Sequence, residues 1–84
     1  MTVAPELFSN SREMDFRQLR IRAKISQYRL AKLAGVEQTT ISQLELGKVR
    51  DPRWSTIAAL ATALDVTAGT VAKAIEATAR RRIA

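Results

Sequence analysis

The feature that most constrains the fold of this chain is a segment of two short helical patterns joined by a glycine, QYRLAKLAGVEQTTISQLEL, residues 27–46. Gly35 follows the first pattern, at the position where a helix commonly turns through a left-handed conformation that glycine adopts without steric cost. Ala31 lies four residues earlier, and its methyl side chain lets two helices cross closely. The segment therefore predicts two helices that meet at a sharp corner.

Apolar residues at helical spacing mark the buried side of both predicted helices. They are Leu30, Leu33 and Ala34 in the first helix, Val36 at the corner, and Ile41 and Leu44 in the second. The opposite face of the second helix is polar and carries Gln38, Thr39, Ser42 and Gln43. One side of this pair is thus predicted to pack on the domain core, and the polar face is free to bind a partner.

This spacing resembles the helix-turn-helix of the phage-repressor/Cro type, also called the XRE-like family of bacterial and phage transcriptional regulators. The resemblance runs from about Phe16 to about Val71. It rests on Ser26-Gln27, Ala31, Gly35, Ile41, Leu44, Glu45-Leu46-Gly47-Lys48, Pro52, Leu60-Ala61 and Ala63-Leu64-Asp65-Val66. It implies an all-α, five-helix, lambda-repressor-like DNA-binding domain. It also implies a homodimer on a palindromic double-stranded DNA operator, acting as a repressor that blocks RNA polymerase or, at some sites, recruits it.

The charge of the chain agrees with a polyanionic partner. The net charge is +6, the pI is about 10.8, and basic residues flank the motif on both sides. They are Arg12, Arg17, Arg20, Arg22, Lys24, Arg29 and Lys32 before or within it, and Lys48, Arg50 and Arg53 after it. A basic rim around a polar helix is typical of groove binding.

The residue types that are missing exclude several classes of function. The chain has no cysteine and no histidine, which removes thiol catalysis, imidazole bases and the usual zinc ligands. Because no nucleophile-base pair or phosphate loop appears either, we expect no enzyme, no cofactor and no metal. No apolar run approaches a membrane span and residues 1–10 lack the regions of a signal peptide. We therefore expect a bacterial cytoplasmic or nucleoid protein without a membrane partner.

The pattern predicts a flexible N-terminal arm at residues 1–9, a domain at residues 10–79 and a basic tail at residues 80–84. The five predicted helices run from Asn10 or Ser11 to about Lys24, from the N-cap Ser26 to Gly35, from about Gln38 to Leu46, from Asp51-Pro52 onward, and from the N-cap Thr67 onward. Asn10 and Glu13 have the spacing of a capping box. The tail, with Arg80 to Arg82, either contacts phosphate or forms a solvated helix end.

The last two helices carry the remaining predictions about the core. Trp54, Ile57, Leu60, Ala61 and Leu64 form the predicted buried stripe of the fourth helix, so Trp54 is expected in the core rather than stacked on a base. In the fifth helix, small and apolar residues are open to two interpretations, a two-fold contact between copies or packing within one chain. They are Ala68, Ala72 and Ala79 beside Val71 and Ile75.

Candidate site residues follow from the polar face and from the resemblance. Glutamine can pair bidentately with adenine in the major groove, so Gln38, Thr39, Ser42 and Gln43 are the predicted base readers. The resemblance gives Gln27 the role of a phosphate anchor. The predicted backbone contacts are Arg20, Lys48, Arg50 and Arg53, and the resemblance also implies a partly buried ion pair between Arg20 and Glu45.

Two residues depart from the family pattern. Glu37 stands where the recognition helix usually has a serine or threonine N-cap, and Leu46 replaces a common asparagine before Gly47. Glu37 favours the helix dipole but lies near incoming phosphates. The contacts at both ends of this helix are therefore expected to differ from the family pattern.

Three other functions are compatible with the sequence. The protein could be an antitoxin that binds a cognate toxin and autoregulates its operon, or a restriction-modification controller protein, and neighbouring genes would separate these. It could also be an adaptor that uses its basic face on a protein or an acidic membrane. Loss of specific DNA retardation, with retained binding to acidic vesicles, would support the adaptor.

Overall fold

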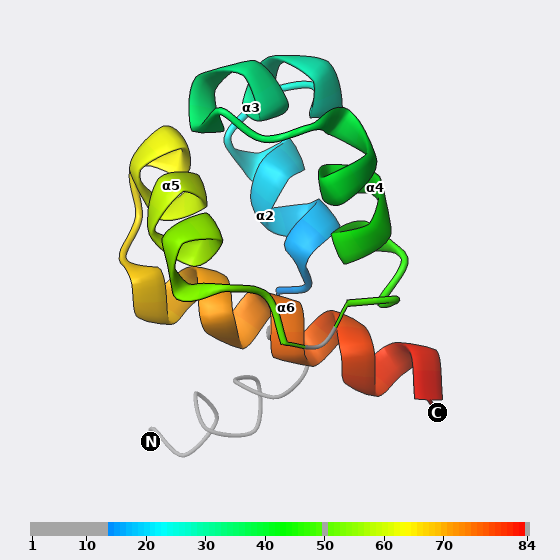
Figure 1. The fold of residues 1–84 in the computed structure, drawn as a ribbon. Helices are drawn as coiled ribbons and strands as arrows, with labels where there is room; N and C mark the ends of the chain where they lie inside the picture. The colour runs from blue at the N-terminus through cyan, green and yellow to red at the C-terminus, as the bar shows by residue number, and fades with distance from the viewer. Residues whose placement is uncertain (1–13, 50, 84) are drawn as a thin grey trace.

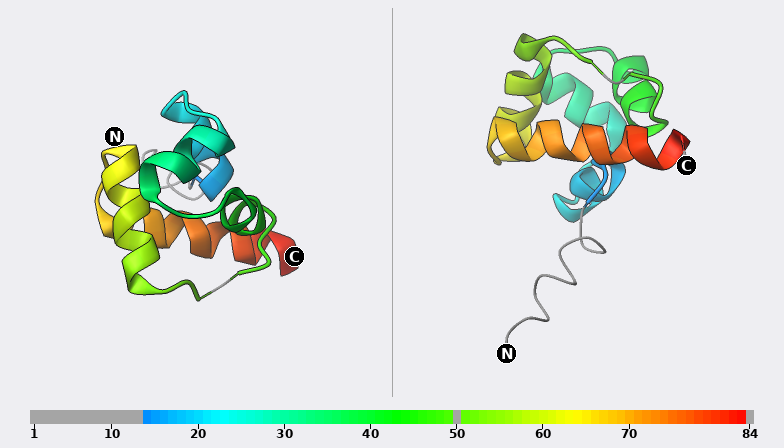
Figure 2. Two further views of the ribbon diagram at one scale, coloured as in Figure 1. Left: turned by 45° about the horizontal axis from the view of Figure 1, so that its top comes forward. Right: turned by 90° about the horizontal axis from the view of Figure 1, so that it is seen from below.

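The computed structural model describes residues 14–49 and 51–83. Over these ranges the chain forms five helices and no strand: α2 Phe16–Arg22, α3 Gln27–Ala34, α4 Gln38–Glu45, α5 Trp54–Leu64 and α6 Ala68–Ile83. The long helix α6 crosses one side of the domain, with α5 packed near its beginning and α4 near its end (Figure 1, Figure 2). The predicted all-α helix-turn-helix fold is confirmed. The predictions for the arm at residues 1–9, the Asn10–Glu13 capping box and Arg50 lie outside the described residues.

Helix α2 begins later than the sequence pattern predicted. Asp15 is extended (φ −83°, ψ 177°) and forms a capping box with Gln18, in which each side chain bonds the other residue's backbone amide. The helix ends at Arg22, and Lys24 adopts a left-handed conformation with φ 60°. One continuous helix from Asn10 or Ser11 to Lys24 is therefore wrong, because the backbone leaves the helical conformation at both Asp15 and Lys24.

The corner between α3 and α4 forms as its sequence predicts. The hydroxyl of Ser26 accepts a hydrogen bond of 3.0 Å from the backbone amide of Arg29 and so caps α3. Gly35 ends that helix with φ 72°, and the amide of Val36 then donates to the carbonyl of Ala31 at 3.0 Å. At the start of α4, Glu37 makes no side-chain capping bond. Hence α4 begins without the cap that serine or threonine would provide.

One residue of the predicted α3 stripe lies at the surface. Leu30 and Ala31 are buried and Ala34 is half-buried, whereas the side chain of Leu33 is 56% exposed. Helix α3 packs on α4 and α5, and these neighbours cover the sector of Leu30, Ala31 and Ala34. Leu33 lies at the edge of that sector, so its prediction as a core residue is wrong.

Helix α5 begins at Trp54, with Arg53 as its N-cap, so Pro52 precedes the helix instead of opening it. Ile57, Leu60, Ala61 and Leu64 are buried as predicted, but Trp54 is 66% exposed. A side chain on the first turn leans toward the helix N-terminus. Trp54 therefore extends past the part of α5 that its neighbours cover, and its predicted place in the core is wrong.

Helix α6 closes the core from below in Figure 1. Thr67 caps it by accepting a bond of 3.1 Å from the amide of Thr70, which confirms the predicted N-cap. Val71, Ile75 and Ala79 are buried within the single chain, so packing within one chain is the interpretation that holds for them. Residues 80–83, expected as a basic tail, are the last turn of α6.

The two ends of the described chain are tied together by polar contacts. The hydroxyl of Thr78 in α6 accepts a bond of 2.8 Å from the backbone amide of Phe16, which is fully buried, and donates one of 2.9 Å to the carbonyl of Ala74. Nearby, Arg81 pairs with Asp15 at 2.6 Å. These contacts hold the start of α2 against α6. The apolar core lies between them and the corner, and comprises Phe16, Leu19, Leu30, Ala31, Ile41, Leu44, Ile57, Leu60, Ala61, Leu64, Val71, Ala74 and Ile75.

Within the part of the chain that the structure describes, no single helix has the length and apolar composition of a membrane span. Helices α5 and α6 meet that test only when taken together, across a bend of 109°.

Candidate nucleic-acid interface

The polar face of α4 lies open at the surface. Gln38, Thr39 and Gln43 are exposed and Ser42 is half-buried. Gln38, Thr39 and Ser42 line a shallow depression together with Glu37 and with Gln27 from the first turn of α3. The structure therefore brings the predicted base readers to one side of α4, with Gln27 beside them. Gln43 lies one turn after Thr39 on the same helix.

A buried carboxylate organises the base of this surface. Glu45, at the end of α4, forms an ion pair with Arg20 of α2, and their side chains are 5% and 12% exposed. Arg20 Nε pairs with Oε2 of Glu45, and Arg20 Nη2 donates to its Oε1 at 3.3 Å. Arg20 Nη1 donates to the carbonyl of Ile25 at 2.8 Å. This is the ion pair expected from the sequence, and it ties α2 to α4.

The same geometry shows how Arg20 is held. Each of its three guanidinium nitrogens donates to an acceptor inside the protein, and 12% of its side chain is exposed. A guanidinium has five N–H groups, so two of them are not used in these three bonds. Arg20 therefore has a structural role in the ion pair, and its contact with phosphate stays a prediction.

Gln27 connects this ion pair to the recognition surface. Its Nε2 donates to Oε1 of Glu45 at 2.9 Å, and its Oε1 accepts from Nε2 of Gln38 at 3.4 Å. The bond to Glu45 determines the orientation of the Gln27 amide, since a carboxylate accepts and cannot donate. Gln38 keeps its carbonyl oxygen and one N–H for a partner. One acceptor and one donor are what bidentate pairing with adenine requires.

Two pairs of exposed basic residues lie near the helix-turn-helix. Lys48 and Arg53 are exposed on either side of the loop that follows α4. Both are among the residues predicted to contact phosphate. Arg29 and Lys32 are exposed on the outer face of α3, with Lys32 Nζ 5.3 Å from the centre of the Tyr28 ring. Helical spacing puts this outer face on the side of α3 opposite Gln27. The cations of α3 and the polar face of α4 thus do not form one continuous surface.

The connection from Glu45 through Gln27 to Gln38 is the part of the site that sequence reasoning missed. These residues are separated by 18 and 11 positions in the chain, and no local spacing relates them. The only sequence signal was the resemblance, which gave Gln27 a role as an anchor. Among the residues that the structure describes, no group of three or more acidic, histidine or cysteine side chains could hold a metal ion.

Comparison with known proteins agrees with this geometry. Neither the curated proteins nor the solved structures contain a match to the chain. A family model described as a helix-turn-helix domain matches residues 15–74, which include α2 to α5 and the first part of α6. That match covers more than half of the chain. The protein therefore belongs to the helix-turn-helix domain family, which is typical of XRE-like DNA-binding proteins.

Proposed function

We propose that the protein is a sequence-specific transcriptional repressor that binds a palindromic double-stranded DNA operator as a homodimer. The observation that carries this proposal is the exposed polar face of α4, beside a network that orients its first glutamine. An α-helix fits the major groove, where each base pair presents a distinct pattern of donors and acceptors. A network that orients the Gln38 amide fixes the directions of the donor and the acceptor that would read such a pattern.

In this proposal, Gln38, Thr39, Ser42 and Gln43 read base edges. Gln38 and Gln43 offer a donor and an acceptor each, which suits adenine, and the methyl group of Thr39 suits the methyl group of thymine. Gln38 is held by Gln27 at 3.4 Å. Because its amide is oriented before binding, less side-chain entropy is lost when it contacts a base.

Phosphate contacts supply the affinity that does not depend on sequence. Lys48 and Arg53 are exposed cations near the end of α4, and Arg50 lies between them in the chain. The second N–H of the Gln27 amide is free to donate to a phosphate. Contacts made by lysine and arginine release counterions, so this part of the affinity falls as salt rises.

Two copies are needed to bind one DNA site strongly and selectively. A single domain of this size reads few base pairs, whereas a dimer reads two half-sites about 34 Å apart on one face of DNA. An operator of that length that overlaps a promoter excludes RNA polymerase. Repression by this route requires no second domain and no small-molecule ligand.

The experiment that tests the proposal is selection from a randomised duplex pool at about 150 mM salt, followed by measurement of the affinity for the enriched sequence and for scrambled DNA. We expect an enriched palindrome that is bound at least ~10³-fold more tightly than scrambled DNA. Absence of enrichment, with binding that disappears steeply as salt rises, would show attraction between charges alone and refute the proposal.

A further inference from the structure

Glu37 is an acidic residue on the polar side of α4 that the proposed function leaves without a role. It comes directly before the first residue of α4 and is exposed. It lines the shallow depression there together with Gln27, Gln38, Thr39 and Ser42, which are all uncharged. The N-terminal residues of a recognition helix typically contact base edges. Glu37 therefore lies where the proposed function places the DNA.

The carboxylate of Glu37 is not used to hold the fold together. It makes no capping bond to α4, and it takes part in no hydrogen bond or ion pair with any other residue that the structure describes. The carboxylate at the other end of α4 differs in both respects, because Glu45 is 5% exposed and is bound by Arg20 and Gln27. Glu45 is thus a structural partner, whereas Glu37 keeps its acceptors for a ligand.

A carboxylate without a partner inside the protein has few suitable partners on DNA. It accepts hydrogen bonds and cannot donate them, and the DNA phosphates repel it. In the major groove, guanine and thymine present acceptors, and adenine presents the acceptor N7 beside its amine. Cytosine presents its N4 amine without an adjacent acceptor of its own. Cytosine is therefore the base that best satisfies a carboxylate.

We infer that Glu37 reads a cytosine, by accepting a hydrogen bond from its N4 amine in the major groove. The inference rests on the proposed function, because it requires α4 to lie in that groove. Glu37 and Gln38 are consecutive, so this cytosine lies close to the base that Gln38 contacts. On other sequences the carboxylate faces phosphates without a compensating hydrogen bond, which weakens binding to the wrong DNA. Glu37 thus determines specificity through both attraction and repulsion.

The test compares the base preferences of the wild-type chain and of Glu37→Gln, by selection from a randomised duplex pool and titration of operators changed at one base pair. We expect the wild type to prefer C·G at one position of each half-site by about 5- to 150-fold, the range for one mismatched base pair. Glutamine offers a donor and an acceptor, which suits adenine. In Glu37→Gln the preference at that position should therefore move from C·G to A·T. Binding to scrambled DNA should become tighter, because a negative charge is lost.

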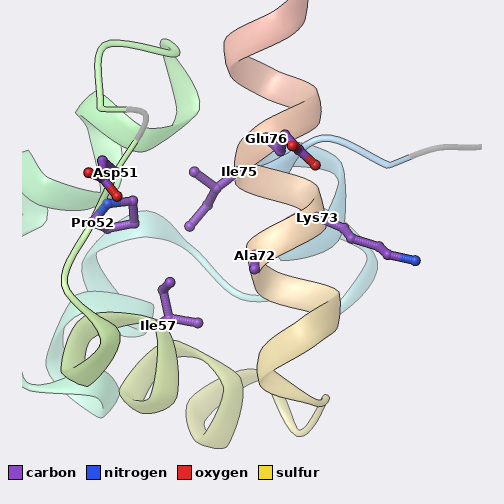
Figure 3. Close-up of a pocket in the computed structure, with 7 residues that line it drawn as sticks. All are labelled: Asp51, Pro52, Ile57, Ala72, Lys73, Ile75 and Glu76. Carbon is purple, nitrogen blue, oxygen red and sulfur yellow. The ribbon is translucent and has the colours of Figure 1, made fainter.

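The matched control is Glu76→Gln, which removes the same charge outside the depression on α4. Glu76 lies on α6 near Lys73, across from the loop that holds Asp51 (Figure 3), and its side chain is 68% exposed. This variant should keep every base preference of the wild type. A gain on scrambled DNA that is larger for Glu37→Gln than for Glu76→Gln would show that Glu37 lies closer to the phosphates, because salt screens distant charges.

A modified base gives a second test, in which the wild-type chain can be used. One N4 hydrogen of cytosine pairs with guanine, and the other faces the major groove. N4-methylcytosine keeps the base pair and replaces the hydrogen that faces the groove with a methyl group. In the enriched operator it should weaken binding of the wild type by at least about 5-fold. Glu37→Ala, which has no carboxylate to lose that bond, should bind both operators equally.

The outcomes separate this inference from the proposed function. Equal base preferences in the wild type and Glu37→Gln, or a wild type that is insensitive to N4-methylcytosine, would overturn the inference and leave a specifically bound operator standing. A uniform gain of Glu37→Gln on all sequences would also overturn it and leave Glu37 only a repulsive role. If a variant unfolds by circular dichroism, the modified base still decides with the wild type. A wild type that enriches no sequence would refute the proposed function and this inference together.

Discussion

The side-chain amide of Gln27 donates a hydrogen bond of 2.9 Å to the Glu45 carboxylate, which is also the partner of Arg20. Through this bond a buried ion pair between α2 and α4 orients a residue at the surface. Gln27 in turn accepts a hydrogen bond from Gln38, the first residue of α4. A change at the buried pair should therefore alter both stability and the geometry of the exposed polar face.

Removal of Glu45 alone should destabilise the protein more than removal of the whole pair. Glu45→Ala leaves the guanidinium of Arg20 buried without its carboxylate, at an expected cost of about 3–5 kcal/mol in the free energy of unfolding. The double variant R20M/E45L replaces both charges with apolar side chains and should lose less. Urea unfolding of the three proteins tests this, and equal losses would show that the pair does not behave as a buried one.

Gln43 and Lys48 should have different effects on DNA binding. Gln43→Ala removes a predicted base contact, so it should cost about 1–3 kcal/mol on the preferred operator and relax the preference at one position. Lys48→Ala should weaken binding to all sequences and reduce the slope of log affinity against log salt by about 1. Titrations at several salt concentrations measure both. A uniform loss on every sequence from Gln43→Ala would reassign Gln43 to the phosphate contacts.

Thr78 should matter more than its small size suggests. Thr78→Val keeps the volume but removes the acceptor for the buried amide of Phe16, and an unsatisfied buried donor costs about 1–3 kcal/mol. The matched control is Thr62→Val in α5, because Thr62 makes a similar bond to the carbonyl of Ala58 but is exposed. We expect the control to change stability by less than about 0.5 kcal/mol. Similar losses in both variants would contradict the assigned role of Thr78.

Two glycines should respond in opposite directions to replacement by alanine. Gly35 has φ 72° and open space where a Cβ atom would lie, so Gly35→Ala should lose about 1–2 kcal/mol from backbone strain alone. Gly69 lies in α6, where an added Cβ would be 3.9 Å from the Thr67 hydroxyl, so Gly69→Ala should gain up to about 1 kcal/mol. Thermal unfolding of both variants measures the difference. A neutral result at Gly35 would show that the corner tolerates another conformation.

The sequence alone determined the corner between α3 and α4 and the caps of α3 and α6. Ser26, Gly35 and Thr67 begin or end helices through backbone groups within a few residues of themselves. Their positions in the local sequence are therefore enough to predict these helix ends. The buried residues Leu30, Ile41 and Leu44 were also predictable, because helical periodicity shows which side of a helix is apolar.

The tertiary structure decided what lies far apart in the chain. The start of α2 is held by Thr78, 62 residues away, and by Arg81, 66 residues away, and no pattern near Phe16 indicates either. Trp54 has the spacing of a core residue but lies beyond the part of α5 that other helices cover. The pairing of Gln27 with Glu45 likewise exists only once α3 and α4 have packed. Helical periodicity predicts which side of a helix is apolar. Whether a side chain on that side is buried depends on which faces the distant helices cover, and this coverage exists only in the assembled fold.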